Sequence, residues 1–381
     1  MIHLSNSLNI CKISEQLKWF VIIGSLVLLF QSCAVTPDLH ESVLIQGVEP
    51  IAELIKIPVG GVDQWLLIRS ANAENPVFLF LHGGPGAAEM PLLRYYNYGL
   101  ERYFTVVMWD QRGAGKSNTR SVPPESITME QLLDDTHEIV HYLKTRFGKT
   151  KIFLAGHSLG TVLGIQAIKG HPEDFYAYVG IGQVVDMKRN VESAYLLSSE
   201  LAKEKGNKKD IRMFSGMQIN GRYSGGSDLE KAIYMRDWIT RNGRIIYERN
   251  NINNLAKVVL TAPEYTIIDK LKYMSGLNRS RRLLWTSDLF ELNFFKEAPV
   301  LNVPVYFISG KYDYLTSDEL TREYFEFVQA PFKELVVFDY SAHCAIFEEP
   351  LKFNQLMINN VLKHAVSAIN KDNSVSSLSV K

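Results

Sequence analysis

Cysteine is scarce in this chain, and there is no excess of charge of either sign. The 381 residues include 3 cysteines, Cys11, Cys33 and Cys344, which have neither the number nor the spacing of a disulfide framework or a zinc site. Lysine plus arginine (41) equals aspartate plus glutamate (41), so no overall field would hold a nucleic acid. We therefore expect a small or neutral substrate, no nucleic-acid partner, no metal and no organic cofactor.

The composition also argues against disorder. Apolar residues make up 46% of the chain and charged residues 22%, which is ordinary for a globular protein that buries a large core. The length exceeds that of most single domains, but α/β enzymes often exceed 250 residues as one core with an insertion. One core with an inserted segment is therefore the expected organisation.

A long apolar run lies near the N-terminus. Residues 19–30 are apolar apart from Gly24 and Ser25, and Ser32-Cys33 follows them. This pattern is typical of an export signal, and Cys33 resembles the acylated cysteine of a bacterial lipoprotein. An uncleaved anchor and a buried helix are the alternatives, although the run is shorter than the roughly 20 apolar residues that span a bilayer. We expect residues 1–36 to be a leader or anchor, with the membrane as partner and the catalytic part in the cell envelope, outside the cytoplasm.

Short apolar runs alternate with helical patterns from residue 45 onward. Runs typical of strands buried on both faces are 77–81, 105–109, 151–155, 178–181, 305–308 and 335–338. A hairpin at a sheet edge is expected at 52–57 and 64–68, around Gly60-Gly61, and the clearest helix is 129–147, capped by Gly148. This alternation predicts an α/β fold with a mostly parallel central sheet and helices on both faces.

The alternation is interrupted between residues 186 and 298. This stretch is charged and helix-like, and Gly221, Gly243 and Pro263 punctuate it. We interpret 186–298 as an inserted helical cap that divides the core into 45–185 and 299–368. The serine-rich end, 369–381, is expected to be a flexible tail.

Ser158 is the candidate nucleophile. It lies in Gly156-His-Ser-Leu-Gly160, between an expected strand and the helix-compatible residues 161–168. The G-x-S-x-G turn requires glycines because the backbone packs tightly around a strained serine. The alternative interpretation of Ser158 is a helix N-cap.

A serine nucleophile requires a base, and the base requires a carboxylate that orients it. Folds that carry this turn place the acid after a late strand and the histidine after the last one. Asp313 follows the expected strand 305–308, and His343 follows 335–338, so these are the predicted acid and base. Asp339, at the end of the strand that precedes the histidine, is the rival acid.

His82-Gly-Gly-Pro-Gly86, directly after the strand 77–81, is a candidate oxyanion loop. Glycines allow the backbone to turn its amides inward, so we expect the N–H groups of Gly84 and Leu159 to form the oxyanion hole. A phosphate-binding loop is the competing interpretation, but the spacing of the known glycine-rich phosphate motifs is absent there.

Taken together, these motifs resemble the prolyl aminopeptidase (proline iminopeptidase) branch of the α/β-hydrolases. The resemblance covers about residues 50–365 and rests on the HGGPG loop, the triad positions, Trp109-Asp-Gln-Arg-Gly-Ala-Gly-Lys-Ser117 and Glu348-Glu-Pro350. It implies a helical cap over the active site and release of an N-terminal residue, often proline, from small peptides.

The nucleophile motif departs from that branch. Its members usually carry Gly-Gly-Ser-Trp-Gly, whereas Gly156-His-Ser-Leu-Gly160 is similar to the motif of many esterases. An aminopeptidase also binds a protonated amine, which requires carboxylates, and Glu192 and Glu230 of the cap are available. His82 and Gln183, near the motifs, are further candidates for substrate contact.

The leading functional hypothesis is a serine hydrolase that forms an acyl-enzyme and releases N-terminal, proline-type residues from short peptides. A carboxylesterase or lactonase that acts on small acyl substrates would use the same groups. A non-catalytic binding module on a hydrolase fold is the alternative from another class, since fold alone does not determine function. Cys344, next to His343, is expected to be a packed thiol.

Overall fold

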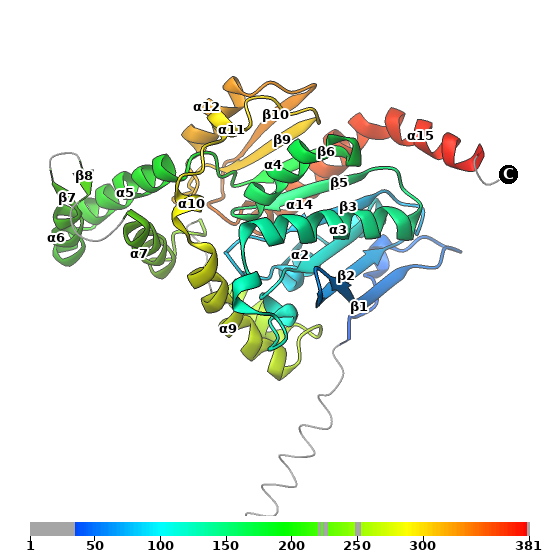
Figure 1. Ribbon diagram of the computed structural model, residues 1–381, viewed down its shortest axis with the longest axis horizontal. Coiled ribbons are helices and arrows are strands. Elements are labelled where there is room, and N and C mark those ends of the chain that lie inside the picture. Colours follow the sequence, from blue (N-terminus) through cyan, green and yellow to red (C-terminus); the bar gives the residue numbers. More distant parts are fainter. Residues whose placement is uncertain (1–34, 220–221, 224–227, 248–252, 379–381) are drawn as a thin grey trace, which may run out of the picture.

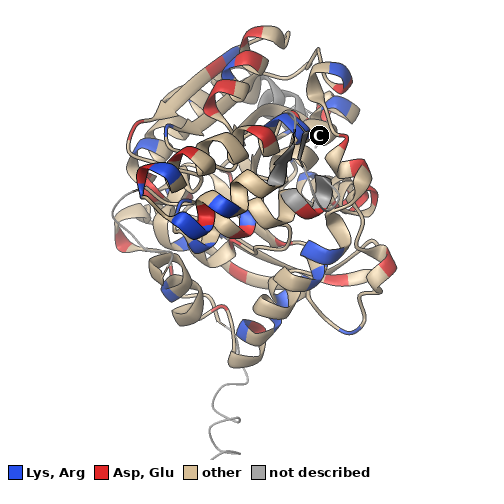
Figure 2. Cartoon of the chain, turned by 90° about the vertical axis from the view of Figure 1, so that its left-hand side faces the viewer, with Lys and Arg blue, Asp and Glu red and all other residues tan. Residues whose placement is uncertain are grey.

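The computed structural model describes residues 35–219, 222–223, 228–247 and 253–378 (Figure 1). Residues 1–34 of the expected leader, with the candidate lipidation site Cys33, lie outside these ranges. Among the residues described, no helix has the length and apolarity needed to cross a bilayer. Acidic and basic residues are interspersed over the face drawn in Figure 2, which agrees with the balanced composition.

The core is an 8-stranded sheet with the order β1-β2-β4-β3-β5-β6-β9-β10. The strands are β1 (Ile51–Val59), β2 (Val62–Ser70), β3 (Val77–Leu81), β4 (Thr105–Asp110), β5 (Ile152–His157), β6 (Phe175–Ile181), β9 (Val305–Gly310) and β10 (Lys333–Phe338). The pairings β1·β2 and β2·β4 are antiparallel, and the pairings from β4 to β10 are parallel. The predicted α/β fold class, with a mostly parallel sheet and an edge hairpin, is confirmed.

Alternate residues of the central strands face two separate cores. Leu79 and Leu154 belong to the apolar cluster that contains α3 (Met129–Phe147) and α4 (Gly160–Gly170). Phe80 and Phe153 belong to the cluster of the other face, with α2 (Met90–Tyr96) and α14 (Pro350–Leu356). Because successive side chains of a strand point to opposite faces, strands with two buried faces become continuous apolar runs.

Short-range features of the sequence mark the turn of the expected hairpin and the two ends of the expected helix. Gly60 and Gly61 both have positive φ (54° and 78°), as the two central residues of a type I′ hairpin turn require. The Thr128 side chain caps the start of α3 by accepting a hydrogen bond from the Gln131 N–H. Gly148 ends that helix in the left-handed conformation.

Between β6 and β9 the chain forms a mainly helical insertion, which Figure 1 shows beside the sheet. Its helices are α5 (Met187–Glu204), α6 (Lys208–Met217), α7 (Asp228–Arg241), α8 (Asn253–Thr261), α9 (Ile267–Leu284), α10 (Ser287–Phe290) and α11 (Phe294–Glu297), and its short hairpin is β7 (Gln218–Ile219) and β8 (Arg222–Tyr223). The two ends of the insertion meet: Asp186 and Asn293 form a β-bridge, and the Asn293 amide donates to the Asp186 carboxylate at 2.6 Å.

The remaining helices close the second part of the core. They are α12 (Asp318–Phe327), α13 (Ala345–Glu348) and α15 (Lys363–Leu378), the last preceded by a π-helical turn, Met357–Leu362. Helix α15 extends into the segment 369–381, which was expected as a flexible tail, as far as Leu378. No glycine or proline interrupts residues 363–378, so the helix continues through the serine-rich stretch.

Candidate active site

Ser158 lies in a strained turn between β5 and α4. It is the one non-glycine residue with positive φ, 54°, in the part of the chain that the structure describes. A Cβ at Gly156 would lie 2.4 Å from the Gly160 carbonyl oxygen, and a Cβ at Gly160 would lie 2.2 Å from the Leu81 carbonyl oxygen, so both positions require glycine. The N-cap of α4 is Leu159, which leaves the Ser158 hydroxyl free of a capping role.

His343 and Asp313 form a hydrogen-bonded pair at the ends of β10 and β9. The His343 Nδ1 is 2.8 Å from the Asp313 Oδ2. The other carboxylate oxygen accepts the backbone N–H groups of Leu315 (2.7 Å) and Thr316 (2.9 Å). Burial alone would raise the pKa of Asp313, but the charge of His343 and these hydrogen bonds lower it overall. The carboxylate therefore stays ionised and holds the imidazole in one orientation.

The rival acid, Asp339, lies on the surface. Its side chain is 59% exposed, and the ammonium groups of Lys311 and Lys352 are each 3.9 Å from its carboxylate. The carboxylate paired with His343 is that of Asp313.

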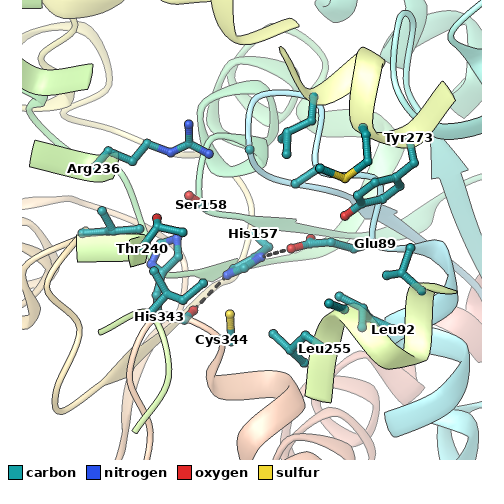
Figure 3. Close-up of a pocket in the computed structure, with 18 of the residues that line it drawn as sticks. Glu89, Leu92, His157, Ser158, Arg236, Thr240, Leu255, Tyr273, His343 and Cys344 are labelled. Atoms are coloured by element: carbon teal, nitrogen blue, oxygen red, sulfur yellow. Dashed lines mark hydrogen bonds and ion pairs between the residues drawn. The ribbon is translucent and has the colours of Figure 1, made fainter. Parts of the chain in front are cut away.

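Ser158 and His343 line one cavity of about 310 Å³, which Figure 3 shows in close-up. Its wall is mainly apolar and comes largely from the cap helices α7, α8 and α9. A smaller cavity of about 60 Å³ adjoins it, and the two share four lining residues: Gly84, Ser158, Arg236 and Leu315. The serine therefore lies where a substrate can extend to either side of the reacting bond.

The HGGPG loop passes directly over the serine. A Cβ at Gly83 would lie 2.8 Å from the Ser158 Cβ, and Gly84 has φ of 125° and is followed by a cis peptide bond to Pro85. Within the described ranges, neither the Gly84 N–H nor the Leu159 N–H donates to a protein acceptor. Both groups are thus available to an oxyanion, and their role in an oxyanion hole stays a prediction.

Two residues predicted to contact substrate have other roles. The His82 ring lies between the Gly83 carbonyl oxygen (2.9 Å) and the Gln111 N–H (3.2 Å), and burial lowers its pKa. The Gln183 side chain accepts a hydrogen bond from the Tyr178 hydroxyl (2.9 Å) and donates one to the Val184 carbonyl oxygen (2.7 Å). Both side chains are buried away from the two cavities, which corrects the expectation that they bind substrate.

The cap carboxylates considered for amine binding also lie elsewhere. Glu192, on α5, and Glu230, on α7, are exposed and line neither cavity. The interpretation of Glu192 as a substrate ligand is therefore corrected. Helical periodicity alone does not show which face of a cap helix is turned toward the core.

The carboxylate in the cavity wall is that of Glu89, a residue that no sequence motif indicated. Its Oε1 is 2.7 Å from the His157 Nδ1, and its Oε2 accepts the Gly83 N–H at 3.3 Å. The His157 Nε2 is 2.9 Å from the main-chain oxygen of His343 (Figure 3). Both ring nitrogens face oxygen atoms, an arrangement that favours the imidazole with both protons. Burial opposes this charge, but Glu89 raises the pKa of His157 overall.

The Trp109–Ser117 motif attaches the cap to the core. The Tyr265 hydroxyl donates to the Asp110 carboxylate at 2.8 Å, and the Lys116 ammonium donates to the Asp269 carboxylate at 2.7 Å. Tyr265 precedes α9, and Asp269 lies in its first turn. Burial raises the pKa of Asp110 to about 7. This motif therefore positions α9 above the active site.

The cysteine beside the histidine is a buried thiol. Cys344 is 6% exposed and unpaired, and burial raises its pKa well above the usual value, so it is a poor nucleophile. Residues 35–378, apart from the undescribed gaps, contain no group of three histidine, cysteine or acidic side chains arranged to hold a metal ion.

Comparison with known proteins identifies the family of the chain. The alpha/beta hydrolase fold family matches residues 76–350. The chain is 34% identical over 323 residues to the probable aminopeptidase YbaC of Bacillus subtilis, covering 84% of this chain and 99% of that protein. It is 23% identical to the proline iminopeptidase of Saccharolobus solfataricus over 78% of this chain and 88% of that protein. The crystal structure of the Mycobacterium smegmatis proline iminopeptidase superposes with a TM-score of 0.61 at 19% identity, covering 83% of this chain and 100% of that one. The chain belongs to the α/β-hydrolases, in their prolyl aminopeptidase-like branch.

Proposed function

We propose that this hydrolase is a serine aminopeptidase that releases N-terminal, proline-type residues from short peptides through an acyl-enzyme. The observation that carries the proposal is the shared cavity, whose wall contains both Ser158 in its strained turn and a histidine fixed by Asp313 at 2.8 Å. The names of the aminopeptidase and iminopeptidase relatives support the substrate class.

The chemistry follows from these positions. The Ser158 hydroxyl attacks the scissile carbonyl while His343 accepts its proton, and the Gly84 and Leu159 amides stabilise the resulting oxyanion. The tetrahedral intermediate collapses when His343 passes the proton to the leaving amine, which breaks the C–N bond. Water then hydrolyses the acyl-serine by the same proton route, and Asp313 remains ionised throughout.

Glu89 supplies the negative charge that an aminopeptidase needs for the substrate amine. A carboxylate offers about four lone-pair sites. The contacts with His157 and the Gly83 N–H occupy one site on each oxygen. The remaining lone pairs can accept hydrogen bonds from an ammonium in the cavity that Glu89 lines. We therefore assign amine binding to Glu89.

The direct test is hydrolysis of N-terminal prolyl and other aminoacyl anilides beside short-chain nitrophenyl esters, with residues 1–36 removed. We expect cleavage of anilides with a free amine, no cleavage of their N-acetylated forms, and no cleavage of any of these substrates by Ser158→Ala. Cleavage of esters alone would assign the enzyme to the carboxylesterases or lactonases. No cleavage of any substrate would favour a binding module on this fold.

We also propose that the enzyme is a lipoprotein of the cell envelope, anchored through Cys33. The apolar run 19–30 followed by Ser32-Cys33 supports this assignment. In cells fed labelled palmitate, the full chain is expected to incorporate label and Cys33→Ser to lose it, while Cys11→Ser, the matched control, keeps it. Equal labelling of the Cys33→Ser protein would exclude lipidation at this cysteine.

A further inference from the structure

Arg236, on the cap helix α7, lines both cavities where they meet at Ser158. Figure 3 shows its guanidinium directed toward the serine. No hydrogen bond or ion pair satisfies this guanidinium among the residues that the structure describes. The adjacent carboxylate, Asp237, is instead paired with Arg281 at 2.6 Å. The Arg236 guanidinium is thus a cation without a hydrogen-bonded or ion-pair partner among the described residues, and it lies beside Ser158.

This cation is partly withdrawn from water. Burial lowers the pKa of Arg236 to about 10, so the side chain remains protonated at neutral pH. A desolvated charge without a partner is unfavourable, and an anionic ligand that formed hydrogen bonds to it would relieve that cost. The planar guanidinium suits a carboxylate in particular, because it can donate two parallel hydrogen bonds.

The other charged groups of the larger cavity favour the same ligand. Lys270, on α9, is a second basic residue of its wall, while the acidic residue, Glu89, is paired with His157. In Figure 3, Arg236 and Glu89 lie on opposite sides of Ser158. A ligand with an amine at one end and a carboxylate at the other would complement both.

We propose that Arg236 binds the C-terminal carboxylate of the substrate, and that the preferred substrates of the proposed aminopeptidase are therefore dipeptides. In a dipeptide, three bonds separate the scissile carbonyl carbon from the carboxylate carbon, a distance of at most about 4 Å. Each further residue moves the carboxylate away by up to about 3.5 Å. The position of Arg236 beside the serine therefore fits the C-terminal carboxylate of a dipeptide, the shortest peptide. This inference rests on the proposed peptidase activity of the same site.

The test compares a prolyl dipeptide with its C-terminal amide, which differs only in the negative charge. The wild-type enzyme is expected to prefer the acid by about tenfold or more in kcat/KM, the range of a charge-assisted hydrogen bond. Arg236→Gln should remove this preference through KM for the acid, and Arg236→Lys should restore part of it. The matched control is Arg241→Gln, because Arg241 is exposed on the same helix and should leave the preference intact.

Two results would overturn the assignment. Equal cleavage of acid and amide by the wild type would exclude carboxylate recognition. An equal loss on both peptides in Arg236→Gln would show a structural role for the side chain. Aminoacyl anilides measured in parallel separate the two proposals, because serine-dependent anilide cleavage supports the peptidase whatever the result for the carboxylate. Absence of cleavage of both anilides and peptides would overturn both.

Discussion

Ser158→Ala is expected to lower kcat by about a millionfold on every substrate that the enzyme hydrolyses. The substitution removes the attacking oxygen, and the rest of the site then provides only oxyanion stabilisation and binding.

Asp313→Asn is expected to lower kcat by about ten-thousandfold, because the amide no longer holds the imidazole in the reactive tautomer. Initial rates on the best substrate, with single-turnover measurements for the slow variants, give both values.

The surface carboxylate Asp339 provides the control for the acid. Asp339→Asn should leave kcat within about twofold, since its carboxylate is 59% exposed and does not contact His343. Thermal unfolding checks that each variant remains folded. Loss of activity in Asp339→Asn together with full activity in Asp313→Asn would reverse the assignment, and an active Ser158→Ala would exclude serine catalysis.

Arg112→Met is expected to lower the free energy of unfolding by about 3–5 kcal/mol. The Arg112 guanidinium donates to both oxygens of Asp135 at 2.8 Å and to the Gly60 carbonyl oxygen at 2.8 Å, and both charged side chains are almost fully buried. Methionine fills similar space but leaves the Asp135 carboxylate uncompensated in the interior. Guanidinium chloride unfolding curves of the two proteins measure the difference.

Two further variants show whether the unpaired charge causes the loss. The double variant Arg112→Met/Asp135→Leu should recover most of the stability, because it removes both charges. Arg322→Met breaks a pair between the exposed Arg322 and the partly exposed Asp318, and should change the free energy of unfolding by about 1 kcal/mol or less. A loss below about 1 kcal/mol in Arg112→Met would show that the interior tolerates an isolated Asp135.

The core was predictable because its signals are local. Strands with two buried faces must be continuous apolar runs, so the ends of the strands in the parallel sheet were recognisable to within three residues. The turn at Ser158 requires Gly156 and Gly160 for steric reasons, so five consecutive residues were enough to identify the candidate nucleophile. The acid and the histidine then follow from the order of the strands.

The residues that we propose to contact substrate, Glu89 and Arg236, were not predictable in the same way. Glu89 meets His157 across 68 positions of sequence, and no short motif describes that pairing. The position of Glu89 just after the HGGPG loop was the available signal. A solvent-exposed glutamate at that position would give the same sequence. The direction in which Arg236 projects depends on how α7 packs. The apolar pattern of α7 in the sequence fits several orientations of this helix. Glu192, a cap carboxylate that the sequence offered for amine binding, faces solvent.

The contact between Asp186 and Asn293 has a consequence for how this enzyme can change. Because the two ends of the insertion are joined at 2.6 Å, the chain leaves and re-enters the core at neighbouring points, as it would for a short loop. Lengthening a loop whose ends are already fixed adds little closure entropy. The proposed triad belongs to the core, while Arg236 belongs to the insertion, so we expect exchange of the cap to alter selectivity and to leave the proposed triad in place. Chimaeras joined at residues 186 and 293 are the natural way to transfer specificity among relatives of this fold.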